Sequence, residues 1–240
     1  MRSSVADMPG NLQDQRDVTG PAGPSAWCLS QSKRAFDFVG GCLLLVLGTP
    51  VMLLVAVLVA ITSRGPILFR QPRVGRNGRE FILLKYRSMK QNLRDSGPGL
   101  TRKGDSRVTA VGRVLRRSKL DELPQLINVI RGDMSLVGPR PDLAEYLRNL
   151  TPQEKSILAL RPGIASVTSL RFVNEEELFA EVSPEKLIDH YTNIHLPEKI
   201  RQDLEYARTA SLGSDVALLL HTISGVIRHS FGLNRREGRQ

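Results

Sequence analysis

One apolar run, from Phe36 to Ile61, limits what this chain can fold into more than any other part of the sequence. At roughly 26 residues it is long enough to enter or cross the hydrocarbon core of a bilayer. A cleaved signal peptide is a poor interpretation, because the run is too long, starts late and lacks the small residues of a cleavage site. A buried core helix is a weak alternative at this length. The sequence therefore predicts a membrane element.

Thr49 and Pro50, near the centre of the run, predict a break or kink. Proline lacks the amide donor of a helical residue and disfavours helical geometry in the residue before it. Both flanks are basic, with Lys33 and Arg34 before the run and Arg64 after it, so the positive-inside rule does not orient a straight span. We favour a re-entrant helix-break-helix with both ends on the cytoplasmic side over a proline-kinked spanning helix, which bilayers also tolerate.

The strong positive charge of the chain predicts an anionic partner. The formal net charge is +10 and the isoelectric point is about 10.1, which suits nucleic acid, an acidic membrane surface or phosphorylated substrates. The single Trp and the 5% aromatic content argue against a stacking platform for single-stranded nucleic acid. The two cysteines, Cys28 and Cys42, predict no disulfide because the second lies in the apolar run, and a reducing compartment is the simpler interpretation.

The chain divides into three parts. Residues 1–30 contain several Pro and Gly and no apolar periodicity, which predicts a disordered N-terminal extension. Residues 31–64 form the membrane element, and residues 65–240 have the length of one domain. We expect no internal repeat.

Residues 65–240 predict a mostly helical α+β domain. Two short apolar segments, Pro66–Gln71 and Arg79–Arg87, predict a β-hairpin, and residues 91–106 predict a loop. The last predicted helix has an apolar side that suits either the membrane surface or the core. Helical spacing and start signals predict helices at Thr109–Arg117, Leu123–Ile130, Pro141–Asn149, Pro152–Leu160, Pro184–Tyr191, Pro197–Arg208 and Asp215–His229.

An adjacent acidic pair, Asp121 and Glu122, precedes Pro124, which suits the first turn of a helix. Most such pairs only cap a helix and interact with its dipole. Here cations precede the pair, and we expect them to keep a carboxylate ionised and nucleophilic while they and the helix N-terminus bind phosphate. These cations are Arg113, Arg116, Arg117 and Lys119.

Further cations are candidates for binding phosphate or a nucleotide. Arg140 lies before Pro141 in a Pro-Arg-Pro sequence that restricts the backbone, although a surface turn would explain it too. Arg161 suits a nucleotide contact or an ion pair. Lys85 and Arg87 alternate along a predicted strand and so share one face, but one of them could instead be solvated.

Two smaller expectations concern the remaining ionisable residues. Asp37, beside the apolar run, is expected to pair with Arg34 three residues away on the same helical face. The four histidines show no metal-ligand spacing, so we expect surface or packing roles for them.

Six segments occur in an order that resembles the motifs of the bacterial sugar transferase family, the monotopic polyprenyl-phosphate phosphoglycosyl transferases. The resemblance is strong over residues 31–165 and looser beyond, and several long motifs in order are more specific than any single motif. The segments are Lys33–Asp37, Phe81–Met89, Gly112–Arg117, Lys119–Ile130, Gly132–Pro141 and Arg161–Gly163.

The resemblance implies a mechanism. Asp121 would attack the sugar-linked phosphorus of a UDP-sugar and expel UMP, and polyprenyl phosphate would then take the sugar phosphate from the carboxylate in a ping-pong reaction. Glu122 would act as the neighbouring base or as a ligand of Mg²⁺, together with Asp121. Asp105 and Arg107 resemble the family's Asp-x-Arg element, or they only close a loop. Arg117 joins the expected phosphate-binding residues.

The resemblance also implies a place and an architecture. We expect an α+β, mostly helical fold in which a re-entrant membrane helix is followed by a cytosolic catalytic domain, residues 65–240, with a β-hairpin and interfacial amphipathic helices. The expected location is the bacterial inner membrane, with the catalytic domain on the cytoplasmic face. Membrane lipids are expected partners, nucleic acid is not, and a homodimer is left open.

The chain departs from the family after Gly163. Ile164–Phe172 stands where many members have a Thr-Gly-Trp-x-Gln-Val stretch, so the sugar and nucleotide contacts are not transferable there. Two rival interpretations are a basic membrane-tethered nucleic-acid binder and an inactive membrane scaffold of the same fold.

Overall fold

The computed structural model describes residues 23–90, 100–101, 104–172, 178–179 and 182–230. The helices and strands of the first half are α1 (Ala26–Leu29), α2 (Gln31–Thr62), β1 (Leu68–Val74), β2 (Glu80–Tyr86), α3 (Ala110–Arg117), the 3₁₀ turn η2 (Leu120–Glu122) and α4 (Gln125–Arg131). Those of the second half are β3 (Ser135–Val137), η3 (Glu154–Ala159), β4 (Gly163–Ala165), α5 (Val167–Arg171), η5 (Pro184–Lys186), α7 (Leu187–His190), η6 (Tyr191–His195), α8 (Leu196–Thr209) and α9 (Leu212–Ser230).

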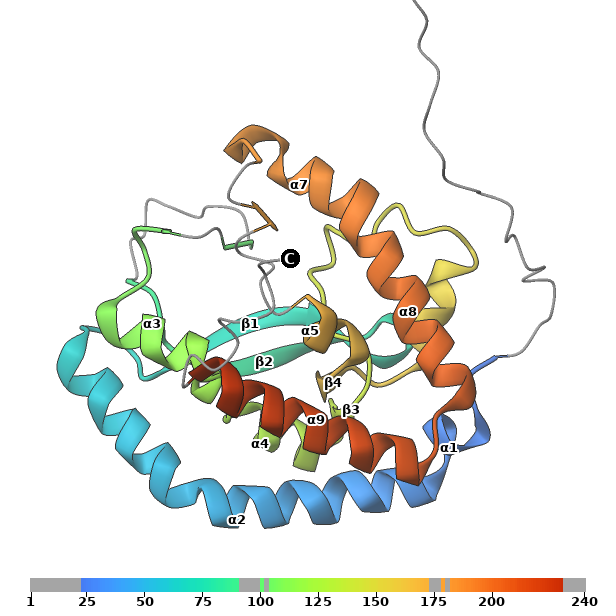
Figure 1. Ribbon diagram of the computed structural model, residues 1–240, viewed down its shortest axis with the longest axis horizontal. Coiled ribbons are helices and arrows are strands. Elements are labelled where there is room, and N and C mark those ends of the chain that lie inside the picture. The colour runs from blue at the N-terminus through green and yellow to red at the C-terminus, as the bar shows by residue number, and fades with distance from the viewer. Residues whose placement is uncertain (1–22, 91–99, 102–103, 173–177, 180–181, 231–240) are drawn as a thin grey trace, which may run out of the picture.

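The apolar run forms one long helix, α2, that curves around the outside of the body (Figure 1). Of the predicted break or kink at Pro50, the break is wrong, because the helix continues past this residue, whereas the ribbon does bend in its second half. Thr49 Oγ1 donates a hydrogen bond to the Leu45 carbonyl at 2.7 Å. Such back-bonding, next to a proline that lacks its own donor, bends a helix while most of its hydrogen bonds persist.

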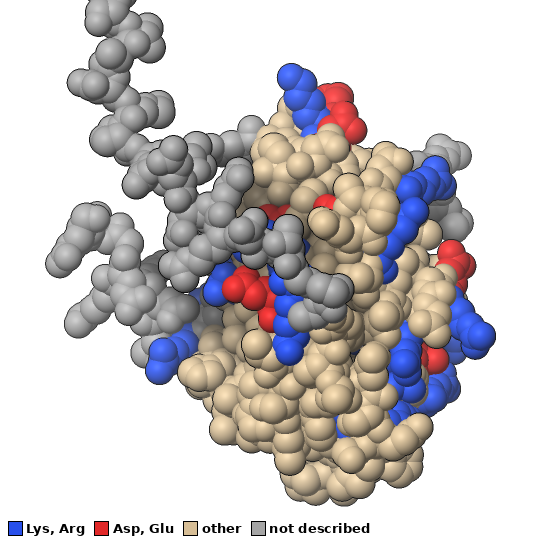
Figure 2. Space-filling view, turned by 90° about the vertical axis from the view of Figure 1, so that its right-hand side faces the viewer, with Lys and Arg blue, Asp and Glu red and all other residues tan. Residues whose placement is uncertain are grey.

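The outer face of α2 is almost wholly apolar. Among the described residues, α2 is the one helix that is both long enough and apolar enough to cross a membrane. Its most apolar window has a mean hydropathy of 2.8, and only 17% of that window is buried. Figure 2 shows no charged side chain at the lower end of the viewed face, at the height where α2 lies in Figure 1. A soluble core helix would be mostly buried, so this exposure supports membrane association.

The predicted β-hairpin is confirmed. β1 pairs antiparallel with β2, from Leu68 opposite Tyr86 to Val74 opposite Glu80. The buried Asn128 of α4 binds the outer edge of β2, because its amide donates to the Ile82 carbonyl at 2.8 Å and its Oδ1 accepts from the Leu84 amide at 3.1 Å. One side chain thus replaces a third strand and holds the hairpin against α4.

A two-stranded parallel sheet, β3 and β4, was not predicted. Ser135 lies opposite Gly163, and Val137 lies opposite Ala165. The two segments approach so closely that a Cβ added at Gly163 would lie 2.1 Å from the Gly138 nitrogen. Short strands distant in sequence lack a periodic pattern of their own, so only the tertiary contact reveals them.

Some predicted helices are confirmed and one is wrong. α3, α4, α8 and α9 match four predictions, whereas 152–160 and 184–191 contain mainly short 3₁₀ and helical turns. Residues 141–149 form turns. The carbonyls that would begin a helix there are already used, because Pro141 accepts from Arg73 Nη1 at 3.2 Å and Asp142 accepts from the Val74 amide at 3.0 Å.

The N-terminal extension is ordered in its described part. Residues 1–22 lie outside the described residues, but α1 follows them within the segment predicted to be disordered. Trp27 Nε1 donates to Asp215 Oδ2 of α9 at 2.8 Å. The prediction of disorder up to residue 30 is therefore wrong for its last part, because a long-range contact stabilises a helix too short to form alone.

Candidate active site

Asp121 and Glu122 lie in the turn η2, between α3 and α4, rather than inside a helix. Lys119 begins this turn in the left-handed region, with φ of 55°, and so reverses the chain between the two helices. Both carboxylates are buried, with exposed fractions of 5% for Asp121 and 8% for Glu122. Burial of two adjacent acids demands compensating contacts, which the hairpin and the segment after β3 supply.

Glu122 is held by two cations from different elements. Lys85 Nζ of β2 lies 2.9 Å from Glu122 Oε1, and Arg140 Nη2 lies 3.7 Å from the same oxygen. Burial alone raises the pKa of Glu122, but Lys85, Arg140 and Lys119 together outweigh it and hold the pKa well below the usual range. Burial also lowers the pKa of Lys85, which Glu122 opposes. Glu122 is thus the fixed charge of the pair.

Asp121 has the opposite environment. Its Oδ1 atom is buried and has no hydrogen-bond partner among the described residues. Burial raises the pKa of Asp121 and Glu122 adds to that rise, while Lys85 and Lys119 only reduce it. Desolvation outweighs the nearby cations in their effect on this pKa, and the expectation that they keep the carboxylate ionised stays a prediction. Asp121 is a desolvated carboxylate with one oxygen that no described residue engages.

Three other predicted site residues take part in hydrogen bonds between a side chain and a backbone carbonyl instead. The buried Arg87 donates to the carbonyls of Ser63 and Pro66, which ties β2 to the end of α2. Arg161 Nε donates to the Gly132 carbonyl at 3.1 Å, and Pro141 contributes its carbonyl to the β1 contact described above. The structure does not bring these three to the carboxylates, and their contacts explain them as structural residues.

The remaining predicted residues lie along α3 and before it. Asp105 and Arg107 form a bidentate ion pair, with Arg107 Nη2 2.7 Å from Asp105 Oδ2. This pair lowers the pKa of Asp105, as does the more distant Arg116, which also acts on Asp121. Arg117 is exposed at the end of α3. The role of these residues in binding phosphate stays a prediction.

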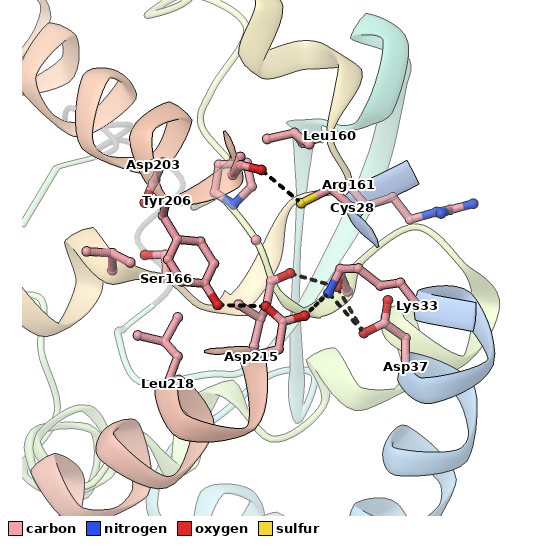
Figure 3. Close-up of a pocket in the computed structure, with 16 residues that line it drawn as sticks. Cys28, Lys33, Asp37, Leu160, Arg161, Ser166, Asp203, Tyr206, Asp215 and Leu218 are labelled. Carbon is pink, nitrogen blue, oxygen red and sulfur yellow. Dashed lines mark hydrogen bonds and ion pairs between the residues drawn. The ribbon is translucent and has the colours of Figure 1, made fainter. Parts of the chain in front are cut away.

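A second buried polar cluster was missed by sequence reasoning (Figure 3). Lys33 Nζ of α2 lies 2.7 Å from Asp215 Oδ2 of α9 and 3.8 Å from Asp37 Oδ1. The Tyr206 hydroxyl donates to Asp215 Oδ1 at 2.7 Å, and the Ser135 hydroxyl donates to Asp37 Oδ1 at 2.9 Å. The cluster joins α2, α8, α9 and β3. The acid Asp37, next to the apolar run, was the only signal of this cluster in the sequence.

This cluster corrects the predicted pair of Asp37 with Arg34. Arg34 instead donates from Nη1 to the Val129 carbonyl and from Nη2 to the Ile130 carbonyl, both at 2.7 Å. It thereby caps the C-terminal end of α4, whose last carbonyls lack partners within the helix. The start of α2 is thus bound to the helix that follows the acidic pair.

The geometry can be compared with known proteins. The model of a family described as bacterial sugar transferase matches residues 29–229. The chain belongs to the bacterial sugar transferase family. The match includes α2, both carboxylates and α9, so it covers the membrane element as well as the body of this sugar transferase.

Curated relatives of this sugar transferase are named as phosphotransferases. It is 34% identical, over 95% of its length and 85% of the relative, to UDP-glucose:undecaprenyl-phosphate glucose-1-phosphate transferase of Caulobacter vibrioides. It is 36% identical, over 81% of its length, to UDP-N-acetylgalactosamine-undecaprenyl-phosphate N-acetylgalactosaminephosphotransferase of Aeromonas hydrophila. It is also 36% identical, over 83%, to undecaprenyl-phosphate glucose phosphotransferase of Komagataeibacter xylinus. It spans 43% and 36% of these last two proteins, less than half their length.

Proposed function

We propose that this sugar transferase moves a sugar 1-phosphate from a UDP-sugar to polyprenyl phosphate through a covalent intermediate on Asp121. In the first half-reaction a carboxylate oxygen of Asp121 attacks the sugar-bearing phosphorus, and the bond from that phosphorus to the bridging oxygen of UMP breaks. UMP leaves with the electron pair. In the second half-reaction an oxygen of polyprenyl phosphate attacks the same phosphorus and releases the Asp121 carboxylate.

The observation that carries the proposal is the difference between the two buried acids. Glu122 is engaged by Lys85 and Arg140, whereas Asp121 Oδ1 is buried and has no hydrogen-bond partner among the described residues, so none of them competes with a phosphorus atom for it. A desolvated carboxylate has little hydration to lose when it attacks. The names of the relatives support the overall exchange, with undecaprenyl phosphate as acceptor.

The cations around Glu122 suit the charge that phosphoryl transfer creates. Arg140 is partly exposed and offers a planar fork that matches phosphate oxygens. Lys85 extends from β2 to Glu122, where its ammonium offsets negative charge on the carboxylates and on a bound phosphate. We assign Glu122 the task of orienting Lys85 and Arg140 and of helping the acceptor oxygen attack.

Mg²⁺ belongs to the proposal as a cofactor. The described residues contain no group of three or more His, Cys, Asp or Glu side chains that could hold a metal. The adjacent carboxylates of Asp121 and Glu122 nevertheless suit Mg²⁺, which commonly uses one or two carboxylates and completes its shell with water and substrate phosphates. Asp121 and Glu122 would hold the ion, which would offset charge on the diphosphate when bound.

The proposed location is the inner membrane, with α2 re-entrant and the body on the cytoplasmic face. α2 is bound to the body near its start by Lys33 and Arg34 and near its end by Arg87. A helix held to one body at both ends enters and leaves the bilayer on the same side more readily than it spans it. The exposed apolar stripe of α9, which includes Val216 and Leu220, suits the membrane surface.

Cysteine labelling tests the topology. In a chain with Cys28→Ser and Cys42→Ala, single cysteines at the exposed positions Gln31 and Arg64 flank α2. A re-entrant helix predicts that both react with an impermeant maleimide only in inverted membrane vesicles. Labelling of the two positions from opposite sides would establish a spanning helix. Denatured samples provide the control for full reactivity.

The transferase activity is tested in its two halves. With Mg²⁺ and a panel of UDP-sugars but no acceptor, we expect about one UMP per active site and a protein mass raised by one sugar phosphate. Added polyprenyl phosphate should then give lipid product and continued UMP release. UMP release that strictly requires the acceptor, with no protein adduct, would contradict the covalent mechanism. Salt-sensitive DNA binding without UMP release would favour the nucleic-acid alternative.

A further inference from the structure

A hollow with a few charged side chains among mainly apolar ones includes Arg140 in its lining. Its lining includes Arg140, Asp142, Lys199 and Asp203, together with apolar side chains of η3 and α8 such as Ile157. Arg140 belongs both to this hollow and to the contact with Glu122, where its Nη2 lies 3.7 Å from the carboxylate. A molecule whose phosphate is bound by Arg140 can therefore extend directly into the hollow.

The deepest polar groups of the hollow come from α8 and are not used by the proposed chemistry. Asp203 is 7% exposed, and its Oδ2 accepts a hydrogen bond from Thr168 Oγ1 at 3.2 Å. Burial raises the pKa of Asp203 to about 7, with Asp142 adding to the rise. Near neutral pH this carboxyl group therefore exists in both forms, and it can accept or donate a hydrogen bond.

The neighbouring groups are held rigidly by aromatic contacts. Lys199 is 6% exposed, and its Nζ lies 4.9 Å from the ring centroid of Tyr191 and 5.6 Å from that of Phe172. The Tyr191 hydroxyl donates to Asp142 Oδ1 at 2.9 Å. Side chains fixed in this way present their polar atoms without a large loss of entropy on binding.

The chemistry of this hollow selects one part of a nucleotide sugar. Besides Arg140, the hollow holds two carboxyl groups and the single ammonium group of Lys199, so it has no excess positive charge for a diphosphate, which stays at Arg140. In the nucleotide, uracil presents a single N–H donor, at N3, beside two carbonyl oxygens, so it offers these carboxyl groups one hydrogen bond. A sugar ring presents hydroxyl groups that donate to carboxylates and apolar ring carbons that pack on side chains such as Ile157.

We infer that this hollow holds the sugar of the donor and that Asp203 recognises its hydroxyl groups. The inference rests on the proposed function for the direction in which the donor extends from Arg140. It also names a specificity-determining residue in the part of the chain where the family motif is absent, because Thr168, the partner of Asp203, lies within the departing segment. The alternative is that Asp203 only joins α8 to α5.

Binding measurements separate the sugar from the rest of the donor. UDP-glucose, UDP-galactose, UDP-N-acetylgalactosamine and UMP are titrated into the full chain carrying Asp121→Asn, which prevents consumption of the donor. Asp203→Asn is added to this chain, and Thr168→Val serves as a second variant that changes the same contact. Glu205→Gln is the matched control, because Glu205 is exposed on the same helix.

Asp203→Asn is expected to weaken binding of the best UDP-sugar at least tenfold and to reduce the preference among the three sugars. The affinity for UMP should stay within about twofold, since UMP lacks the sugar. An unchanged affinity for every UDP-sugar would overturn the inference, as would an equal loss for UMP. If Asp203→Asn does not fold, Thr168→Val decides by the same criteria.

The outcome is independent of the transferase test. A chain with Asp121 restored that releases no UMP, while Asp203→Asn still selectively weakens UDP-sugar binding, would refute the proposed reaction and keep the sugar site. Normal UMP release with no effect of either variant on sugar preference would keep the reaction and refute the site. Absence of any UDP-sugar binding would refute both.

Discussion

Asp121→Asn is expected to abolish turnover and to leave the protein at least as stable as the wild type. Loss of the nucleophile removes the covalent route, for which we expect a fall in turnover of about 10⁴-fold or more. Stability should not fall, because burial raises the pKa of Asp121 and the folded state therefore disfavours its ionised form near neutral pH. An uncharged isostere avoids that cost. UMP release and thermal unfolding in detergent micelles measure the two effects.

Measuring thermal unfolding beside UMP release distinguishes loss of the nucleophile from loss of the folded structure. Asp189→Asn, at an exposed position of α7, is the matched control and should change neither quantity. A stable Asp121→Asn protein with activity near that of the wild type would eliminate Asp121 as the nucleophile. An inactive protein with a much lower unfolding temperature would instead assign Asp121 a structural role and contradict its description as a destabilising charge.

Lys85→Met is expected to destabilise the protein by about 3 kcal/mol, because it leaves Glu122 buried with only Arg140 near its carboxylate. The double variant Lys85→Met with Glu122→Gln should recover most of this loss, since the unpaired charge is then removed. Denaturant unfolding in detergent micelles measures all three proteins. Equal destabilisation in the single and double variants would show that packing, rather than the ion pair, explains the effect.

Activity has a separate expected response to Lys85→Met. Turnover needs ionised Asp121, so activity should rise with pH through the pKa of that carboxyl group, which burial places above its usual range. Lys85 lowers the pKa of Asp121, so removing Lys85 should raise that pKa and move the acid limb of the rate profile to higher pH. We expect the double variant Lys85→Met with Glu122→Gln to be more stable than Lys85→Met alone but no more active. An acid limb at the wild-type pH would contradict the proposed electrostatic contact.

Local patterns in the sequence predicted the elements whose stability depends on local spacing. The apolar run predicted α2, alternating residues predicted the hairpin, and amphipathic spacing predicted α8 and α9. The family motifs identified Asp121 and Glu122 as the centre of the candidate site. Strand alternation and the Pro-Arg-Pro sequence made Lys85 and Arg140 candidates for binding phosphate, and both lie beside Glu122.

Tertiary contacts decided what the local patterns did not contain. The acids at 121 and 122 are adjacent and equally acidic in sequence, yet burial and the cations give them opposite pKa shifts. Lys33 and Asp215 are 182 residues apart, and no periodic pattern indicates their contact.

The sequence by itself determined the long apolar helix, most of the secondary structure and the choice of Asp121 and Glu122 as candidate site residues, because hydrophobic periodicity and short motifs are local properties. Only the tertiary structure decided that Pro50 bends α2 without ending it, that β3 pairs with β4, and that Arg87 and Arg161 bind the backbone. These outcomes depend on desolvation and on hydrogen bonds between distant segments. Their free energies exist only once the chain has packed.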